Sequence, residues 1–225
     1  SAGEEPFRPM PAQPAVPFTD ERLATGLRLI SAVDRLAPVV AVNLWYDVGS
    51  KHEVEGKTGF AHLFEHVMFQ GSRDVGKAEH MSIVQGAGGT MNGSTWLDRT
   101  NYYETLPSHQ AELALWLEAN RMGTLLDALN QENLDNQREV VKNEKRWSYD
   151  NRPYGSVYEK IQGHIFPPGH PYHHVTIGSM EDLDAASVED VSAFFRTYYA
   201  PNNAVLSVVG DVEPGEIRAW TERYF

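Results

Sequence analysis

Two histidines and a glutamate fall within five consecutive residues, His62-Leu63-Phe64-Glu65-His66. On a helix, His62 and His66 are four positions apart and therefore share a face, about one turn from each other along the axis. Two imidazoles at that spacing can bind one metal ion. Glu65 borders the same face, where its carboxylate can polarise a water without being a ligand. The spacing predicts a metal site on a helix.

The alternative is an ordinary amphipathic helix that carries these three residues by chance, since five-residue patterns recur without function. Both histidines, however, lie in a stretch rich in apolar residues, where an unpartnered polar group would be costly to bury. A metal ion explains that placement. The order H-x-x-E-H is also the inverted form of the zincin signature, so zinc is the expected ion.

A catalytic zinc usually has three protein ligands and one open position, so a third ligand must come from elsewhere in the chain. The chain has no cysteine, which leaves histidine and carboxylate. The best candidates are Glu139 and Glu144 in the segment QREVVKNE, and spacing alone does not choose between them. The alternative for each is a solvated glutamate that pairs with neighbouring lysine or arginine side chains.

Periodicity predicts the elements that must position these residues. Apolar residues at helical spacing predict a helix over 59–70 around the histidines, and a charged helix over 130–149 carries the candidate third ligand. Further helices are expected over 77–85, 108–126, 187–199 and from Pro214 onward, with a short one near Val157 in the otherwise irregular 151–174. Strands are expected over 22–32, 39–48, 86–106 and 204–209. This order predicts the α+β class, with helices packed on a mixed or antiparallel sheet.

Composition narrows the classes of partner. The 225 residues, 41% of them hydrophobic, suffice for one sizeable core, expected over 19–225 after a flexible Pro-rich arm at 1–18. The net charge of -12 argues against nucleic acid as a partner. No apolar stretch approaches the ~20 residues that span a bilayer, so no membrane span is expected. The arm suggests a bacterial protein exported to the periplasm, with a cytoplasmic location as the alternative.

Three segments together resemble one known family. GFAHLFEHVMFQGS, GGTMNGSTWLDRTNYYETLP and QREVVKNEKRWSYDNRPYG follow one another as in the N-terminal domain of the pitrilysin/insulinase peptidases. Within this family, the three segments most resemble those of the bacterial members related to the mitochondrial processing peptidase. The resemblance runs over about 23–225, nearly the whole chain, and it implies one half of a two-domain peptidase chamber.

The resemblance also implies a set of site residues. His62, His66 and Glu144 would be the zinc ligands and Glu65 the general base for a zinc-activated water that hydrolyses a peptide bond. The family has an acid seven residues before the third ligand, and here Gln137 stands at that position, which puts a supporting role there in doubt.

The family binds its peptide or protein substrate as an added strand, and the matching stretch here is about 89–96. Asn92 and Gly93 are the expected substrate contacts. The alternatives for Asn92 are a turn residue and a glycosylation acceptor in Asn-Gly-Ser. Gly93 departs from the alanine that is more common in the family.

Members of the family need a second, related domain or subunit, which supplies an Arg and Tyr pair and closes the chamber. The resemblance therefore implies that this domain alone cleaves poorly or not at all. The alternative is a non-catalytic partner subunit of a heteromeric processing peptidase. Four further histidines gather in GHIFPPGHPYHH, residues 163–174, but their irregular spacing favours local hydrogen bonds over a metal site.

Overall fold

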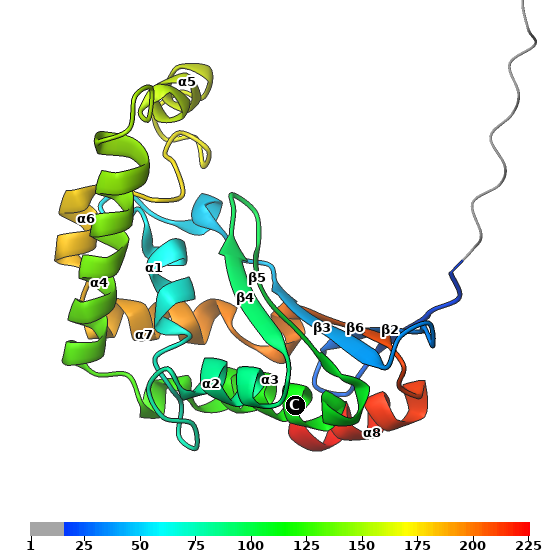
Figure 1. The fold of residues 1–225 in the computed structure, drawn as a ribbon. Coiled ribbons are helices and arrows are strands. Elements are labelled where there is room, and N and C mark those ends of the chain that lie inside the picture. Colours follow the sequence, from blue (N-terminus) through cyan, green and yellow to red (C-terminus); the bar gives the residue numbers. More distant parts are fainter. Residues whose placement is uncertain (1–15) are drawn as a thin grey trace, which may run out of the picture.

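The computed structural model describes residues 16–225, so most of the predicted arm at 1–18 lies outside the described residues. Six strands form one sheet in the order β1-β2-β6-β3-β5-β4. The pair β2 and β6 is parallel, whereas all other neighbours are antiparallel. Helices pack against this mixed sheet (Figure 1), which confirms the predicted α+β class.

The strands are β1 (Thr19–Arg22), β2 (Arg28–Val33), β3 (Val39–Tyr46), β4 (Thr90–Thr95), β5 (Thr100–Pro107) and β6 (Ala204–Gly210). The single strand predicted over 22–32 is wrong, because the chain turns between β1 and β2. At this turn Gly26 has a φ of +88°, and the Leu23 N–H donates to the Leu27 carbonyl at 2.9 Å. The stretch predicted over 86–106 is likewise a hairpin, formed by β4 and β5.

The helices are α1 (Phe60–Val67), α2 (Glu79–Gly86), α3 (Ala111–Thr124), α4 (Gln131–Lys145), α5 (Val157–Ile165), α6 (Met180–Ala185), α7 (Val188–Tyr198) and α8 (Pro214–Tyr224). The sequence pattern did not predict α6, which has only six residues. Its start is nevertheless capped in the usual way, since the Ser179 hydroxyl accepts the Asp182 N–H at 3.1 Å. Beyond α4 the chain continues as a five-residue π-helical turn, Arg146–Asp150.

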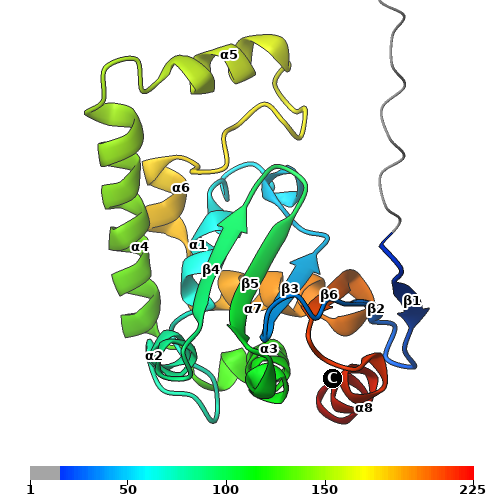
Figure 2. The same ribbon diagram turned by 45° about the vertical axis from the view of Figure 1, so that its right-hand side comes forward.

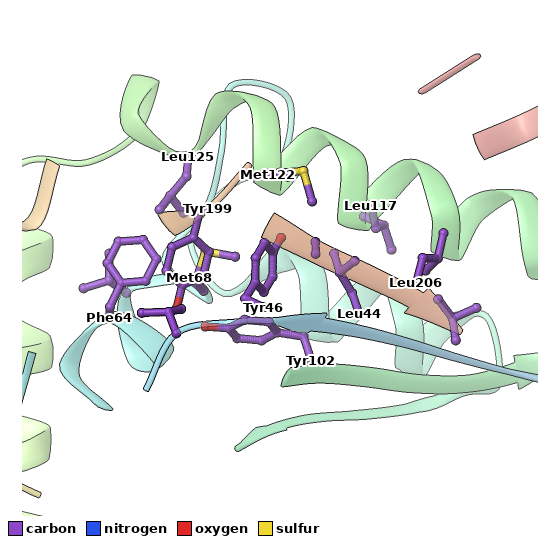
Figure 3. Close-up of a cluster of buried hydrophobic side chains, with 14 of the residues drawn as sticks. Leu44, Tyr46, Phe64, Met68, Tyr102, Leu117, Met122, Leu125, Tyr199 and Leu206 are labelled. Carbon is purple, nitrogen blue, oxygen red and sulfur yellow. The ribbon is translucent and has the colours of Figure 1, made fainter. Parts of the chain in front are cut away.

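Side chains alternate between two faces along the central strand β3. Val40, Val42, Leu44 and Tyr46 are buried, whereas Val39 and Trp45 are exposed. The buried set meets the helices in a core that includes Phe64, Met68, Tyr102, Leu117 and Tyr199 (Figure 3). One face of the sheet is thus covered by helices and the other is open within the described part of the chain.

At the β4 end of the sheet, α1 lies between β4 and α4 in both views (Figures 1 and 2). This places the histidine-bearing helix between the last strand of the sheet and the long charged helix that carries the candidate carboxylates. Within residues 16–225, no helix combines the length and the apolar character needed to cross a membrane.

Candidate metal centre

The start of α1 is fixed by a close approach and by a buried acid. Gly59 has a φ of +85°, and a Cβ there would lie 2.8 Å from the Ile177 carbonyl oxygen. The Glu53 carboxylate accepts the N–H groups of Gly59 and Ala61 at 3.0 and 2.8 Å. A negative charge at the N-terminal end of a helix is attracted by the positive end of the helix dipole and stabilises the helix. These contacts hold in place the helix that presents the two histidines.

Three potential ligand atoms converge between α1 and α4. The Nε2 atoms of His62 and His66 lie 3.3 Å apart. Glu144 Oε2 lies 3.7 Å from His62 Nε2 and 3.5 Å from His66 Nε2. The side chains of the histidines are mostly buried, whereas that of Glu144 is 45% exposed and leaves one side of the group open.

These separations fit a zinc ion. Bonds of about 2.0–2.2 Å from zinc to nitrogen or oxygen place tetrahedral ligand atoms roughly 3.3–3.6 Å apart. Two imidazoles and one carboxylate are also a ligand set typical of catalytic zinc. The residues present in the structure therefore suit zinc in both type and spacing.

The protonation states of His62 and Glu144 also suit the binding of a metal ion. Burial, with a smaller contribution from the neighbouring His66, lowers the pKa of His62 to about 4. The hydrogen bond with His66 lowers the pKa of Glu144. At neutral pH a neutral imidazole and an ionised carboxylate are therefore favoured, which are the forms that bind a metal ion.

Glu65 lies on the side of α1 that faces β4. Burial raises the pKa of its carboxyl group, and a hydrogen bond from Thr95 opposes that rise. Thr95 Oγ1 donates to Glu65 Oε2 at 2.5 Å. A raised pKa suits a carboxylate that must accept a proton near neutral pH.

The other acids and amides of α4 lie elsewhere. Glu139 Oε1 accepts from Lys142 Nζ at 3.0 Å, as expected for a solvated glutamate, and Glu139 is not part of the converging group. Gln137 is buried, and its amide nitrogen lies 3.5 Å from Asn136 Oδ1. His62 Nδ1 is buried without a hydrogen-bond partner among the described residues.

The two predicted substrate contacts lie on opposite faces of β4. Gly93 pairs with buried Tyr102 on the covered face, next to Glu65. Asn92 is exposed and pairs with Tyr103 on the open face, and its Oδ1 accepts the N–H of Gly93 at 2.9 Å. The structure therefore brings Gly93, but not the side chain of Asn92, against α1, the helix of His62 and His66.

A second group of potential ligands lies in the core, where His80, Glu104 and Glu118 offer atoms within 4.8 Å of one another. Arg121 Nη2 donates to Glu118 Oε1 at 2.5 Å, so the guanidinium already supplies a positive charge here. Burial lowers the pKa of His80 to about 2 and raises that of Glu104 well above its usual range. We interpret this group as an internal ion pair of Arg121 and Glu118 with His80 and Glu104 uncharged beside it, rather than a second metal centre.

The four histidines of the 163–174 segment make local contacts. His164 and His173 each approach a backbone carbonyl, those of Lys160 and Phe166, at 2.6 and 2.7 Å. His170 Nδ1 accepts the N–H of Tyr172 at 3.0 Å. His174 differs, because its Nε2 lies 2.8 Å from buried Glu53 Oε2.

Sequence reasoning missed Thr95 and Glu53. Thr95 reads as an ordinary strand residue, and only its alternation with Gly93 on one face of β4 hints that it faces α1. Glu53 lies in a polar loop, and its position ahead of the helix was the only available signal.

Two family models match the chain. One, described as Insulinase (Peptidase family M16), matches residues 28–163. The other, described as Peptidase M16 inactive domain, matches residues 185–225. The first match contains the three residues whose potential ligand atoms converge, and also Glu65.

Curated relatives carry names of the same kind. The chain is 34% identical over 204 residues to zinc protease PqqE of Helicobacter pylori, an alignment that covers 90% of this chain and 45% of the relative. It is 24% identical over 206 residues to the mitochondrial-processing peptidase subunit beta of Blastocladiella emersonii, covering 91% and 43%. The chain thus spans about half the length of the curated relatives it matches.

Solved structures agree with the fold. A protease from Helicobacter pylori superposes with a TM-score of 0.87 at 33% identity, covering 94% of this chain and 50% of that chain. The first half of the periplasmic protease PqqL from Escherichia coli gives a TM-score of 0.81 at 21% identity, covering 92% and 45%. At that lower identity the likeness shows the fold alone.

Proposed function

The chain belongs to the insulinase family of peptidases, family M16, and on this premise we propose that it is the metal-bearing half of a zinc-dependent endopeptidase. The observation that carries the proposal is the convergence of His62, His66 and Glu144 at separations that suit one zinc ion. Relatives that are named zinc proteases support the same activity.

Each residue of the site has a proposed role. His62, His66 and Glu144 hold the ion, which when bound acts as a Lewis acid toward a water and a peptide carbonyl. Glu65 takes a proton from the attacking water as its oxygen bonds to the carbonyl carbon. The same carboxyl group then gives that proton to the amine nitrogen as the carbon–nitrogen bond breaks.

The free edge of β4 is the proposed substrate-binding strand. Its only neighbour in the described sheet is β5, so the N–H and C=O groups on its other edge can pair with an extended peptide. Asn92 and Gly93 would contact the substrate there. Main-chain pairing gives affinity without demanding a particular sequence, which suits an endopeptidase.

A second, related domain or subunit is the proposed partner. The chain spans about half of its matched relatives, and one of these is a subunit of a processing peptidase. The site as described is open on the side of Glu144, and a second half would close it. Periplasmic or exported location stays a prediction from the sequence.

The competing function is that of a non-catalytic partner subunit. It draws support from the match of residues 185–225 to a model described as an inactive domain. The complete group of two histidines and two glutamates favours the catalytic function, since a non-catalytic subunit would have no use for a general base beside a metal site.

Four matched variants test the proposal. His62→Ala and Glu144→Gln should lose zinc, measured by elemental analysis of protein purified without added metal. Glu65→Gln should keep zinc and lose cleavage of a quenched peptide panel, assayed with a second half present. Glu139→Gln is the control, and it should keep both. Cleavage by Glu65→Gln at the parental rate would disprove the assignment of the base, and full activity without a second half would disprove the need for a partner.

A further inference from the structure

Two residues of β4, Gly93 and Thr95, contact the Glu65 side chain. Thr95 Oγ1 donates a hydrogen bond to Glu65 Oε2 at 2.5 Å, and it is the one donor to that carboxylate among the described residues. Gly93 lies two positions earlier, on the same face of the strand. We propose that Thr95 is a positioning residue that orients Glu65 for proton transfer. This inference rests on the proposed function, because it takes Glu65 as the base.

The hydroxyl of Thr95 is held at a fixed point. Thr95 pairs with Thr100 in the β4–β5 ladder. The next residue, Trp96, donates its N–H to the Arg99 carbonyl at 2.9 Å and accepts the N–H of Ser50 at 3.1 Å. Both backbone groups of Trp96 are thus hydrogen-bonded, which fixes the chain immediately after Thr95. Threonine is also β-branched, so its χ1 is restricted, and the hydroxyl has little freedom to move.

Gly93 provides the room that Glu65 needs to lie against the strand. A Cβ at position 93 would lie 3.2 Å from Glu65 Cγ and 3.3 Å from Glu65 Oε1. It would also lie 3.2 Å from Tyr102 Cδ1, a fully buried ring that cannot retreat easily. A methyl group would therefore push the Glu65 side chain away from β4 by a few tenths of an ångström.

Because of the contacts with Thr95 and Gly93, the two carboxylate oxygens of Glu65 have different roles. Oε2 is anchored by Thr95, and Oε1 is left as the oxygen that can take a proton. The anchor lies on the same strand whose free edge is proposed to bind the substrate. Base and substrate backbone would thus be positioned by one rigid element, which is how enzymes keep reacting groups in register.

Thr95→Val tests the anchor, because it keeps the shape and removes the hydroxyl. Thr95→Ser keeps the hydroxyl and removes the methyl. With the zinc-loaded chain and a second half, Thr95→Val should lower kcat about 10- to 100-fold, the range for losing one hydrogen bond to a charged group. KM and zinc content should stay at the parental values. Thr95→Ser should retain kcat within about threefold.

A second measurement does not depend on activity. Crystal structures of the parental chain and of Thr95→Val should differ at Glu65, whose carboxylate should leave its single position in the variant. Thr105→Val is the matched control, since Thr105 is an exposed threonine on the neighbouring strand β5. Its kcat and its Glu65 position should both be parental.

Three results would overturn the inference. They are a parental kcat for Thr95→Val, an unmoved Glu65 in its structure, and a Thr95→Ser variant as impaired as Thr95→Val, which would indicate packing rather than the hydroxyl. Failure of the proposed function is distinguishable, because it would appear as parental cleavage by Glu65→Gln.

Discussion

His174 Nε2 lies 2.8 Å from Glu53 Oε2, and this carboxylate also accepts the N–H groups of Gly59 and Ala61 at the start of α1. A residue from the segment between α5 and α6 thus reaches α1, the helix of His62 and His66, through one buried acid. The Glu53 side chain has 0% exposure. The position of the two proposed histidine ligands therefore depends on a contact outside the candidate metal centre.

Glu53→Ala should destabilise the domain and weaken zinc binding. Removal of the carboxylate leaves the N–H groups of Gly59 and Ala61 without their acceptor and takes the acidic partner from His174, and breaking a buried pair costs about 3–5 kcal/mol. Urea unfolding would give the stability change, and competition with a chelator would give the zinc affinity. Glu55→Ala is the control, because Glu55 is exposed in the same loop. Equal stability of the two variants would contradict the role of Glu53.

The pair of His174 and Glu53 should also make stability depend on pH. The hydrogen bond with Glu53 raises the pKa of His174 above its usual value of 6.5. A base with a raised folded-state pKa contributes stability that is full below the unfolded pKa, near 6.5, and is lost as pH rises through the folded pKa. The stability advantage of the parental chain over His174→Gln should therefore shrink above about pH 6.5. Urea midpoints measured from pH 6 to 9 would check this, and a constant difference would refute it.

Arg121→Met should be strongly destabilising although Arg121 is not part of the candidate metal centre. Its guanidinium is the positive charge beside Glu104 and Glu118, and removal leaves two buried acids without it. The expected loss is about 3–5 kcal/mol. Arg223→Met is the control, because the Arg223 side chain is 70% exposed. Thermal unfolding of the two variants should differ by many degrees.

Zinc content should be close to one ion per chain and not two. The core group of His80, Glu104 and Glu118 already contains the charge of Arg121, so it should take up no metal. His80→Gln should therefore leave zinc content unchanged, whereas His62→Ala should remove it. Elemental analysis checks both. Two ions per chain, with one lost on replacing His80, would show that the core group binds metal.

The sequence predicted those parts of the site that lie within one element. His62, Glu65 and His66 follow from helical spacing alone, because neighbours on a helix face are fixed by geometry. The choice between Glu139 and Glu144 does not follow from spacing. Both lie on α4, and only the packing of α4 beside α1 determines which one reaches the histidines. Thr95 was missed for the same reason, since its contact joins a strand to a helix.

The fold was predicted better in its helices than in its hairpins. The helix over 187–199 and the strand over 204–209 match α7 and β6 closely, because long apolar patterns are little disturbed by their surroundings. The segment 22–32 was read as one strand because leucines run through it. There the turn at Gly26, a glycine in the left-handed region, outweighed the apolar pattern, so that β1 ends at Arg22 and β2 begins only at Arg28.

Glu144 on α4 approaches the histidines on α1, and this contact has a consequence for the stability of the fold. In the unfolded chain the two histidines remain neighbours in sequence, but Glu144 is nearly eighty residues away and the three-ligand site no longer exists. An ion that binds only the folded arrangement adds its binding free energy to folding. In a chain without cysteine, the ion would thus act as a reversible cross-link between two distant segments. A chelator would then loosen the architecture as well as stop the chemistry.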